Sequence, residues 1–236
     1  MRRALSAVPA TDTSGVWAIV VAGGAGTRVG ADMPKQYLPL GGVRVLDHTL
    51  DVTRAVCGDR IVLVVLPDYV AVPEPGVRVA AGGATRSASV RAGLAAVPDD
   101  ANIILVHDAA RPLVPVAVFH RVIAAIDAGA DAAVPGVGVP DTIKRVRSGV
   151  VVETLNRDEL VAVQTPQAFR ATVLRSVHSA ASEATDDAAL VECSGGRVVV
   201  VEGHELARKL TTTDDLAWLA TQLRGEQSGQ PAERTL

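Results

Sequence analysis

The sequence predicts an α/β fold, in which a mostly parallel β-sheet carries helices on both faces. Short runs of β-branched apolar residues alternate with stretches of helical periodicity from residue 16 to about residue 223. This alternation is typical of parallel sheets with crossover helices. The 236 residues are 48% hydrophobic, which is enough for a substantial core without disulfides or structural metal. One domain over residues 16–224 is the simplest interpretation.

The apolar runs predict strands, and the periodic stretches predict helices. The last helix has the clearest signals, because Thr213 is a candidate N-cap and Asp214 and Asp215 stand in its first turn. Residues 1–15 and 225–236 are small, polar and proline-containing, which is typical of mobile tails. The expected strands cover residues 16–22, 60–66, 77–81, 102–107, 132–135 and 198–202, and the expected helices cover residues 47–56, 85–96, 116–128, 171–181 and 213–223.

One segment, within residues 139–158, departs from this alternation. Two short apolar stretches, Thr142–Val146 and Val150–Leu155, flank Ser148-Gly149, a dipeptide typical of a hairpin turn. The segment predicts either an arm that projects and buries its apolar side chains against a second subunit, or an antiparallel extension of the main sheet. The residues alone leave both interpretations open.

The composition argues against several classes of protein. A formal net charge of -3 and 3% aromatic residues provide neither the basic surface nor the stacking platforms of nucleic-acid-binding proteins. Cys57 and Cys193 are distant from each other, which fits a reducing compartment better than a disulfide framework. No apolar stretch approaches the roughly 18 residues of a membrane span, and no signal peptide is evident. We therefore expect a cytoplasmic protein that binds a small molecule.

A glycine-rich turn is the main candidate for ligand binding. Ala22-Gly23-Gly24-Ala25-Gly26-Thr27-Arg28 follows the first expected strand, and Lys35 comes shortly after it. Glycines allow backbone N–H groups to approach an anion closely, and the two cations add positive charge, so the turn suits a triphosphate. A dinucleotide fingerprint would have a third glycine at Val29, and the Gly-Lys-Ser/Thr of a Walker loop does not occur. A plain structural turn is the alternative.

Charged residues also follow two other expected strands. In open α/β sheets, ligands bind beyond the carboxyl ends of the strands, and Asp108 and Arg111 follow the strand that ends at His107. Asp108 suits Mg²⁺ bound to a triphosphate, since magnesium takes one or two carboxylates together with phosphate oxygens. The alternative is that Asp108 caps a turn and pairs with Arg111. Lys209 follows the last expected strand, and His107 is expected to be structural.

Histidines and serines elsewhere in the chain lack the spacing of familiar catalytic motifs. Ser87 and Ser89 follow Gly82-Gly83 without a nucleophile elbow, so we expect them to cap a helix or contact a ligand. The remaining histidines have neither HExxH spacing nor a cysteine partner, which argues against a zinc site. They are His48, His120, His178 and His204.

The motifs occur in an order that carries a resemblance. They read Ala-Gly-Gly-x-Gly-x-Arg, Pro-Lys-Gln-Tyr, Gly-Gly-x-x-Arg-x-x-Ser-Val, Val-His-Asp-Ala-Ala-Arg-Pro, Asp-Thr-Ile-Lys, Gln-Thr-Pro-Gln-Ala-Phe, Ala-Thr-Asp-Asp and Lys-Leu-Thr. Over about residues 16–223 this series resembles the 2-C-methyl-D-erythritol 4-phosphate cytidylyltransferase family of the non-mevalonate isoprenoid pathway. The resemblance implies a Rossmann-like nucleotidyltransferase domain with a projecting β-hairpin arm. It also implies transfer of CMP from CTP to methylerythritol phosphate, with release of pyrophosphate, by in-line attack on the α-phosphorus.

The resemblance further implies roles for individual residues, a divalent cation such as Mg²⁺ and a homodimer formed through the arm. The implied catalytic cations are Arg28, Lys35 and Lys209, and the implied metal ligand is Asp108. The implied CTP contacts are Ala22, Gly23, Gly24, Gly26, Gly83, Ser89, Asp108 and Ala109. The implied contacts to methylerythritol phosphate are Arg111, Thr142, Arg157 and Thr185, of which Thr142 and Arg157 match positions that reach the neighbouring subunit's site.

Two departures and three alternatives accompany the resemblance. Many members have an acidic residue and an asparagine shortly before the lysine matched by Lys209, where this chain has Leu206-Ala207-Arg208. Glu205 is the candidate substitute for that acid, and Ala84 stands where an acidic residue is frequent in the second glycine loop. The alternatives are a ribitol-5-phosphate cytidylyltransferase, an NAD-dependent oxidoreductase and a nucleotide-binding domain without turnover.

Overall fold

The central sheet has eight strands in a computed structural model that describes residues 13–23, 33–72, 74–179 and 186–228. The strands are β1 (Val16–Ala22), β4 (Ile61–Val65), β5 (Arg78–Ala81), β6 (Ile103–Asp108), β7 (Ala132–Gly138), β10 (Val161–Val163), β11 (Gln167–Arg170) and β12 (Val198–Glu202). Their order is β10-β7-β11-β6-β1-β4-β5, with β12 also paired to β7. The neighbours β6, β1, β4 and β5 are parallel, as are β7 and β12, whereas β10 and β11 run antiparallel to their partners. The sheet is therefore mostly parallel, as predicted.

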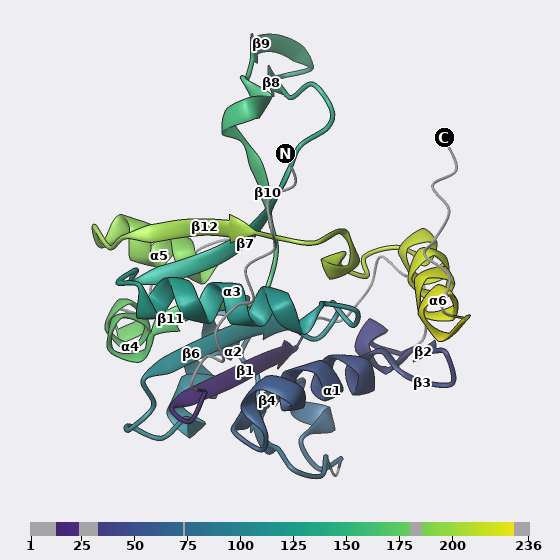
Figure 1. The fold of residues 1–236 in the computed structure, drawn as a ribbon, viewed down its shortest axis with the longest axis vertical. Helices are drawn as coiled ribbons and strands as arrows, with labels where there is room; N and C mark the ends of the chain where they lie inside the picture. The colour runs from purple at the N-terminus through teal and green to yellow at the C-terminus, as the bar shows by residue number, and fades with distance from the viewer. Residues whose placement is uncertain (1–12, 24–32, 73, 180–185, 229–236) are drawn as a thin grey trace, which may run out of the picture.

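Helices cover both faces of this sheet (Figure 1). They are α1 (Val45–Cys57), α2 (Arg86–Ala96), α3 (Val116–Asp127), α4 (Ala171–Ser179), α5 (Asp187–Cys193) and α6 (Thr213–Ser228). Apolar residues of α1 and α3 pack on one face of the sheet, and those of α2, α4 and α5 pack on the other. This arrangement needs strands that are apolar on both faces, which is why the central strands read as continuous apolar runs.

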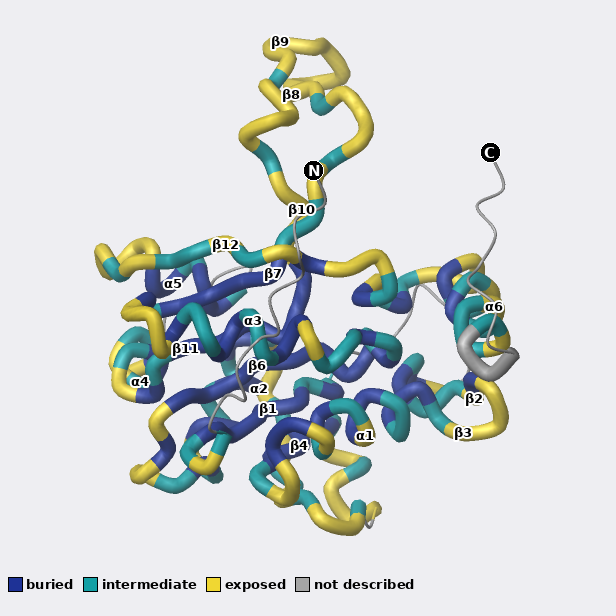
Figure 2. The backbone as a smooth tube through the Cα atoms, viewed as in Figure 1, coloured by how far each residue is buried: buried dark blue, intermediate teal, exposed yellow. Residues whose placement is uncertain are grey.

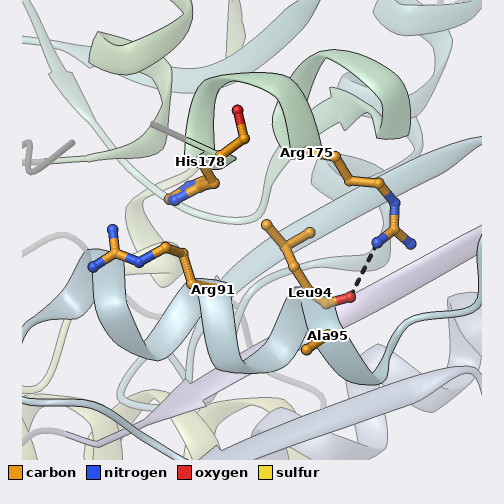
Figure 3. A pocket seen from close by; sticks show the side chains of 6 residues that line it. Arg91, Leu94, Ala95, Arg175 and His178 are labelled. Carbon is orange, nitrogen blue, oxygen red and sulfur yellow. Dashed lines mark hydrogen bonds between the residues drawn. The ribbon is translucent and has the colours of Figure 1, made fainter. Parts of the chain in front are cut away.

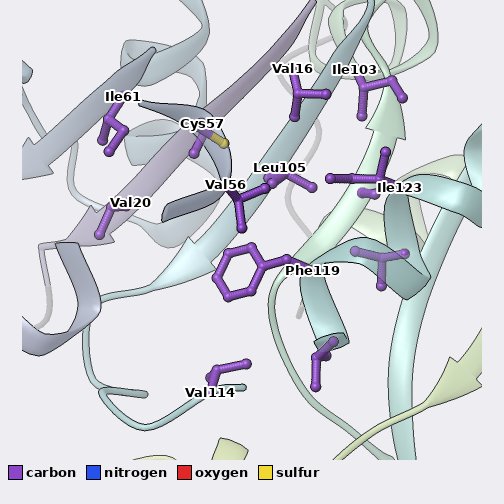
Figure 4. Packing of buried hydrophobic residues seen from close by; sticks show 14 of the residues in the cluster. Val16, Val20, Val56, Cys57, Ile61, Ile103, Leu105, Val114, Phe119 and Ile123 are labelled. Carbon is purple, nitrogen blue, oxygen red and sulfur yellow. The ribbon is translucent and has the colours of Figure 1, made fainter. Parts of the chain in front are cut away.

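The core is built from alternate residues of the same strands. Side chains of β1 alternate between the two faces, so that Ala18 and Val20 join one cluster and Ile19 joins the other. Phe119 of α3 is fully buried in the first cluster, where Figure 4 shows it near Val56 and Leu105. Figure 2 shows the buried residues concentrated in the sheet and in the inner sides of its helices. The strands are therefore packed on both faces, and the charged residues follow at their carboxyl ends.

The segment over residues 139–158 forms a hairpin that projects from the body of the protein. Strands β8 (Lys144–Arg147) and β9 (Val150–Thr154) pair only with each other among the described residues, and not with the main sheet. Strand β7 leads into the hairpin and β10 returns from it (Figure 1). Its surface is almost entirely exposed (Figure 2). The predicted projecting arm is present, and the alternative of an extension of the main sheet is wrong.

Several elements differ from those that the sequence predicts. Strands β10 and β11 and helix α5 were not expected, and α6 continues to Ser228 rather than ending at residue 223. Residues 225–228, which were expected to belong to a mobile tail, are therefore part of α6. Residues such as Glu226 and Gln227 are favourable in helices, but they add no apolar periodicity that would predict one. Among the described residues, no helix combines the length and the apolar character that a membrane span requires.

Candidate functional site

The carboxyl ends of β1 and β6 bring the first two charged loops together. Val21 pairs with Asp108 in the parallel ladder between these strands, and the backbone N–H of Ala109 donates to the carbonyl of Val21 at 3.0 Å. The start of the glycine-rich turn, Gly23, therefore lies beside the Asp108 loop. Both loops leave the sheet at the edge where open α/β sheets bind their ligands.

Three cations surround the carboxylate of Asp108. Lys209 Nζ lies 2.8 Å and Arg111 Nε 3.4 Å from Oδ2, and Arg86 Nε lies 3.8 Å from Oδ1. Asp108 is only 7% exposed. Burial opposes ionisation of this carboxyl, but the charges of Lys209, Arg111 and Arg86 outweigh burial and lower its pKa. Asp108 is therefore ionised at neutral pH, and the surrounding positive charge exceeds its own.

The loop that carries Lys209 is tied to the other two loops by backbone contacts. The N–H of Leu210 donates to the carbonyl of Ala110 at 2.8 Å, and Arg111 donates to the carbonyl of Ala207 at 2.7 Å. Lys35 Nζ donates to the carbonyl of Leu210 at 2.8 Å. Lys35 and Lys209, which are far apart in the sequence, are thus brought to one end of the sheet.

The second glycine loop lies against the first. The hydroxyl of Ser89 accepts from the N–H of Gly83 at 3.2 Å and donates to the carbonyl of Thr85 at 2.9 Å. A Cβ added at Gly23 would lie 3.4 Å from this hydroxyl, and one added at Gly83 would lie 2.5 Å from the Cβ of Ala88. A larger residue would therefore crowd the loop at Gly83, whereas a Cβ at Gly23 would make an ordinary contact. The N-cap of α2 is Thr85, which accepts from Ala88, so the cap expected of Ser87 or Ser89 is supplied by another residue.

His107 has the structural role predicted for it. Its side chain is fully buried, with Nδ1 2.8 Å from the hydroxyl of Thr165 and the ring edge against Phe119. Burial lowers the pKa of His107 to about 3, so the ring is neutral at physiological pH. The same Thr165 hydroxyl accepts from the backbone N–H of Asp108 at 3.0 Å. This contact fixes the end of β6 and with it the carboxylate.

A pocket of about 250 Å³ opens beside Asp108. Strands β10 and β11 and the turn between them supply one wall. The charged side chains come from α2, from β6 and the loop after it, from the N-cap of α5 and from the Lys209 loop. A pocket lined by three cations suits phosphate groups. Its lining residues are Arg86, Asp108, Arg111, Val163, Gln164, Thr165, Gln167, Asp186 and Lys209.

The pocket offers one carboxylate for a metal ion. Asp186 also lines it, but one of its carboxylate oxygens accepts from Ala189 and the other from Gln167, each at 3.0 Å. Asp108 fits Mg²⁺, which binds through one or two carboxylates when substrate phosphates supply further oxygens. Glu205, the candidate second acid, is exposed and does not line the pocket. Within the described ranges, no cluster of three or more acidic, histidine or cysteine side chains is arranged for a metal.

The structure brings together only part of the predicted site. Thr142 and Arg157 lie on the projecting arm, where Arg157 donates to the carbonyl of Pro140, and neither lines the pocket at Asp108. Arg86 and Thr165 were not predicted as site residues. Arg86 is the arginine of the Gly-Gly-x-x-Arg string that begins at the second glycine loop. That string is the feature of the sequence that could have identified it as a site residue. Four predicted residues lie outside the described ranges: Gly24, Gly26, Arg28 and Thr185.

Comparisons with known proteins agree on one family. The family model for IspD, 2-C-methyl-D-erythritol 4-phosphate cytidylyltransferase, matches residues 16–224. The protein of that name from Nocardia farcinica is 46% identical over 222 residues, which cover 91% of this chain and 96% of the relative. The crystal structure of the Thermus thermophilus enzyme has a TM-score of 0.76 at 34% identity, covering 89% of this chain and 98% of that one.

Some similar proteins are larger. The bifunctional enzyme IspD/IspF of Clavibacter michiganensis subsp. michiganensis is 43% identical over 221 residues, which cover 88% of this chain. The match covers 54% of that protein, so this chain spans about half the length of the bifunctional relative.

Proposed function

The chain belongs to the 2-C-methyl-D-erythritol 4-phosphate cytidylyltransferase family, and on that premise we propose how its site carries out the reaction. The enzyme is a nucleotidyltransferase that uses CTP to make 4-diphosphocytidyl-2-C-methyl-D-erythritol for isoprenoid synthesis. The observation that carries the proposal is the convergence of Lys209, Arg111 and Arg86 on the ionised Asp108. The oxidoreductase and the binding-only alternatives have no support in these comparisons.

The acceptor needs no general base. A phosphomonoester has a second pKa near 6 and is largely dianionic at pH 7, so the phosphate of methylerythritol phosphate attacks the α-phosphorus of CTP directly and displaces pyrophosphate. The chain holds two anions together against their repulsion and stabilises the charge of the transition state. We assign this task to Lys35, Lys209 and Arg111, and by resemblance to Arg28.

Asp108 would hold the divalent cation against the phosphates of CTP. A cation held by Asp108 would offset charge on the phosphates of CTP, including charge that develops on the departing pyrophosphate. The glycine loops accept the nucleotide, because Ala22, Gly23 and Gly83 leave room for a base and expose main-chain groups. Ser89 joins the two loops through Gly83.

The proposed function is tested by pyrophosphate release. We expect release with CTP, Mg²⁺ and methylerythritol phosphate, and none when ATP or GTP replaces CTP. Ribitol 5-phosphate is the matched acceptor control. Release with ribitol phosphate alone would retain the mechanism and reject the acceptor, and CTP binding without release under either acceptor would reject the mechanism.

We also propose that the arm joins two subunits into a homodimer. Four valines on the hairpin are more than half exposed: Val146 at 52%, Val150 at 65%, Val151 at 55% and Val152 at 51%. Clustered exposed apolar side chains of this kind are typical of a surface that another chain covers. A dimer would bring the partner's copies of Thr142 and Arg157 to the acceptor site.

Two unpaired cysteines, Cys57 and Cys193, support a cytoplasmic location.

The double substitution Val150→Asp with Val152→Asp is expected to yield a monomer, because the buried carboxylates would lack partners in the interface. The KM for methylerythritol phosphate should rise by about tenfold or more, while the affinity for CTP changes little. Analytical ultracentrifugation and steady-state kinetics measure both effects. Val70→Asp, at a position 39% exposed in a loop of the main body, is the control. An unchanged dimer would reject the arm as the interface.

A further inference from the structure

Two buried ionisable side chains, His178 and Asp187, have no part in the mechanism above. His178 is 4% exposed and Asp187 is 0% exposed. Nε2 of His178 lies 3.0 Å from Oδ1 of Asp187, and Oδ2 of Asp187 accepts from Arg86 at 2.6 Å. Arg86 in turn lies 3.8 Å from Asp108. A continuous chain of contacts therefore runs from the interior of the domain to the pocket.

Each oxygen of the Asp187 carboxylate has one of these partners. Burial opposes ionisation of Asp187, but the hydrogen bond from His178 and the charge of Arg86 outweigh it and lower the pKa. A buried carboxylate is strongly unfavourable unless such partners satisfy it. Because His178 occupies Oδ1, Oδ2 is left to the guanidinium of Arg86. The contact with His178 thereby holds the carboxylate in the orientation in which Oδ2 meets the arginine.

The three residues come from three helices on the same face of the sheet. Arg86 is the first residue of α2, His178 lies in the last turn of α4, and Asp187 is the first residue of α5. The N-cap of α5, Asp186, accepts from Gln167 of β11 at 3.0 Å. Asp187 is therefore fixed at both its backbone and its side chain. Arg86 carries a long side chain, which without such a partner would lose its fixed direction.

We propose that His178 and Asp187 are positioning residues that direct Arg86 into the substrate pocket. Arg86 lines that pocket together with Lys209 and Arg111. With Nη1 held by Asp187, the guanidinium would keep its other donors for a phosphate in this pocket. The inference rests on the proposed function only in assigning this pocket to the phosphates of the substrates.

A second pocket gives access to the histidine. It has a volume of about 300 Å³ and lies between α2 and α4, with His178, Arg91 and Leu94 in its lining. Figure 3 shows His178 on α4 facing the side of α2 that carries Arg91 and Leu94. Removing the imidazole ring would open a path from this pocket to Asp187. A free imidazole molecule is small enough to take the place of the missing side chain.

The test is chemical rescue of His178→Ala. We expect the affinity for CTP, measured by calorimetry, and kcat/KM to fall by about tenfold or more, as is typical when an outer partner of a site residue is removed. Added imidazole should restore both values at pH 8, where its neutral N–H donates to Asp187. Added 1-methylimidazole, which fills the same space but has no N–H, should not. Equal rescue by both compounds, or by neither, would overturn the proposal.

Two further variants separate positioning from stability. His178→Gln retains an N–H donor and should bind CTP nearly as the wild type does, even if the alanine variant folds poorly. In an Arg86→Ala background, His178→Ala should cause no additional loss of CTP affinity, because a positioning residue acts only through its partner. Additive losses would overturn the proposal. The calorimetric values do not depend on the acceptor, so they remain decisive if methylerythritol phosphate is not the substrate.

The matched control is His120→Ala. His120 lies in α3, on the opposite face of the sheet, and its Nδ1 is buried without a hydrogen-bond partner among the described residues, as Nδ1 of His178 is. The same substitution there should leave CTP affinity within about twofold of the wild type. A loss equal to that of His178→Ala would show that the effect is general to histidines with a buried, unpartnered ring nitrogen and would overturn the proposal.

Discussion

Lys35→Ala is expected to lower kcat by about 100-fold to 1,000-fold, the loss typical of removing one group that stabilises transition-state charge. The amine of Lys35 donates to the carbonyl of Leu210, beside Lys209. It therefore lies where the phosphates of CTP would meet the loop that carries Lys209. Loss of its partly buried hydrogen bond to Leu210 costs about 1 kcal/mol. The variant should therefore fold, and the defect should lie in turnover.

Single-turnover kinetics and urea unfolding together check this expectation. Arg54→Ala is the control, since Arg54 is a cation of α1 whose ion pair with Asp51 lies on the exposed side of that helix. Its kcat should match that of the wild type. A Lys35→Ala enzyme with wild-type turnover would remove this lysine from the mechanism, and a loss of folding equal to the loss of activity would assign it a structural role.

Asp108→Asn is expected to abolish measurable turnover and to lower the free energy of unfolding by about 3–5 kcal/mol at pH 7. The substitution leaves Lys209, Arg111 and Arg86 close together without the carboxylate that offsets their charge. It also removes the ionised oxygen that would bind the divalent cation. Urea unfolding and pyrophosphate release measure the two effects separately.

The pH dependence identifies the cause of this destabilisation. Because the pKa of Asp108 is lowered in the folded protein, its stabilising effect is present above the unfolded-state pKa of about 3.9 and is lost as the pH falls toward the folded-state pKa. The difference in stability between the wild type and Asp108→Asn should therefore be constant from pH 7 to about pH 5 and shrink below about pH 4. A difference that does not change with pH would attribute the loss to packing.

The central strands could be predicted from sequence because they are buried on both faces. Their apolar runs are continuous, and β1 and β12 have the predicted limits. Strand β10 has three exposed residues and β11 has four residues, so neither contains a run long enough to be recognised. Both depend on pairing with β7, which only the folded chain provides.

The residues of the candidate site likewise fall into those that the sequence predicts and those that it does not. Asp108, Arg111 and Lys209 could be predicted to converge, because residues that follow neighbouring strands meet at one edge of the sheet. The contact between Arg86 and Asp187 joins the first residues of two helices, and no local pattern relates them. His178 likewise reads as an ordinary helical residue until α4 and α5 are packed together.

The pocket beside Asp108 draws its walls from widely separated parts of the chain, from Arg86 to Lys209. A fragment that ends before the last strand lacks Lys209, and one that begins after α2 lacks Arg86. Affinity for the proposed substrates therefore depends on residues spread over the fold, and a growing polypeptide acquires it only after Lys209 has been synthesised. Bound nucleotide should therefore raise the free energy of global unfolding, by about 2.7 kcal/mol at a ligand concentration 100 times Kd. This stabilisation should extend to the whole domain rather than to one loop.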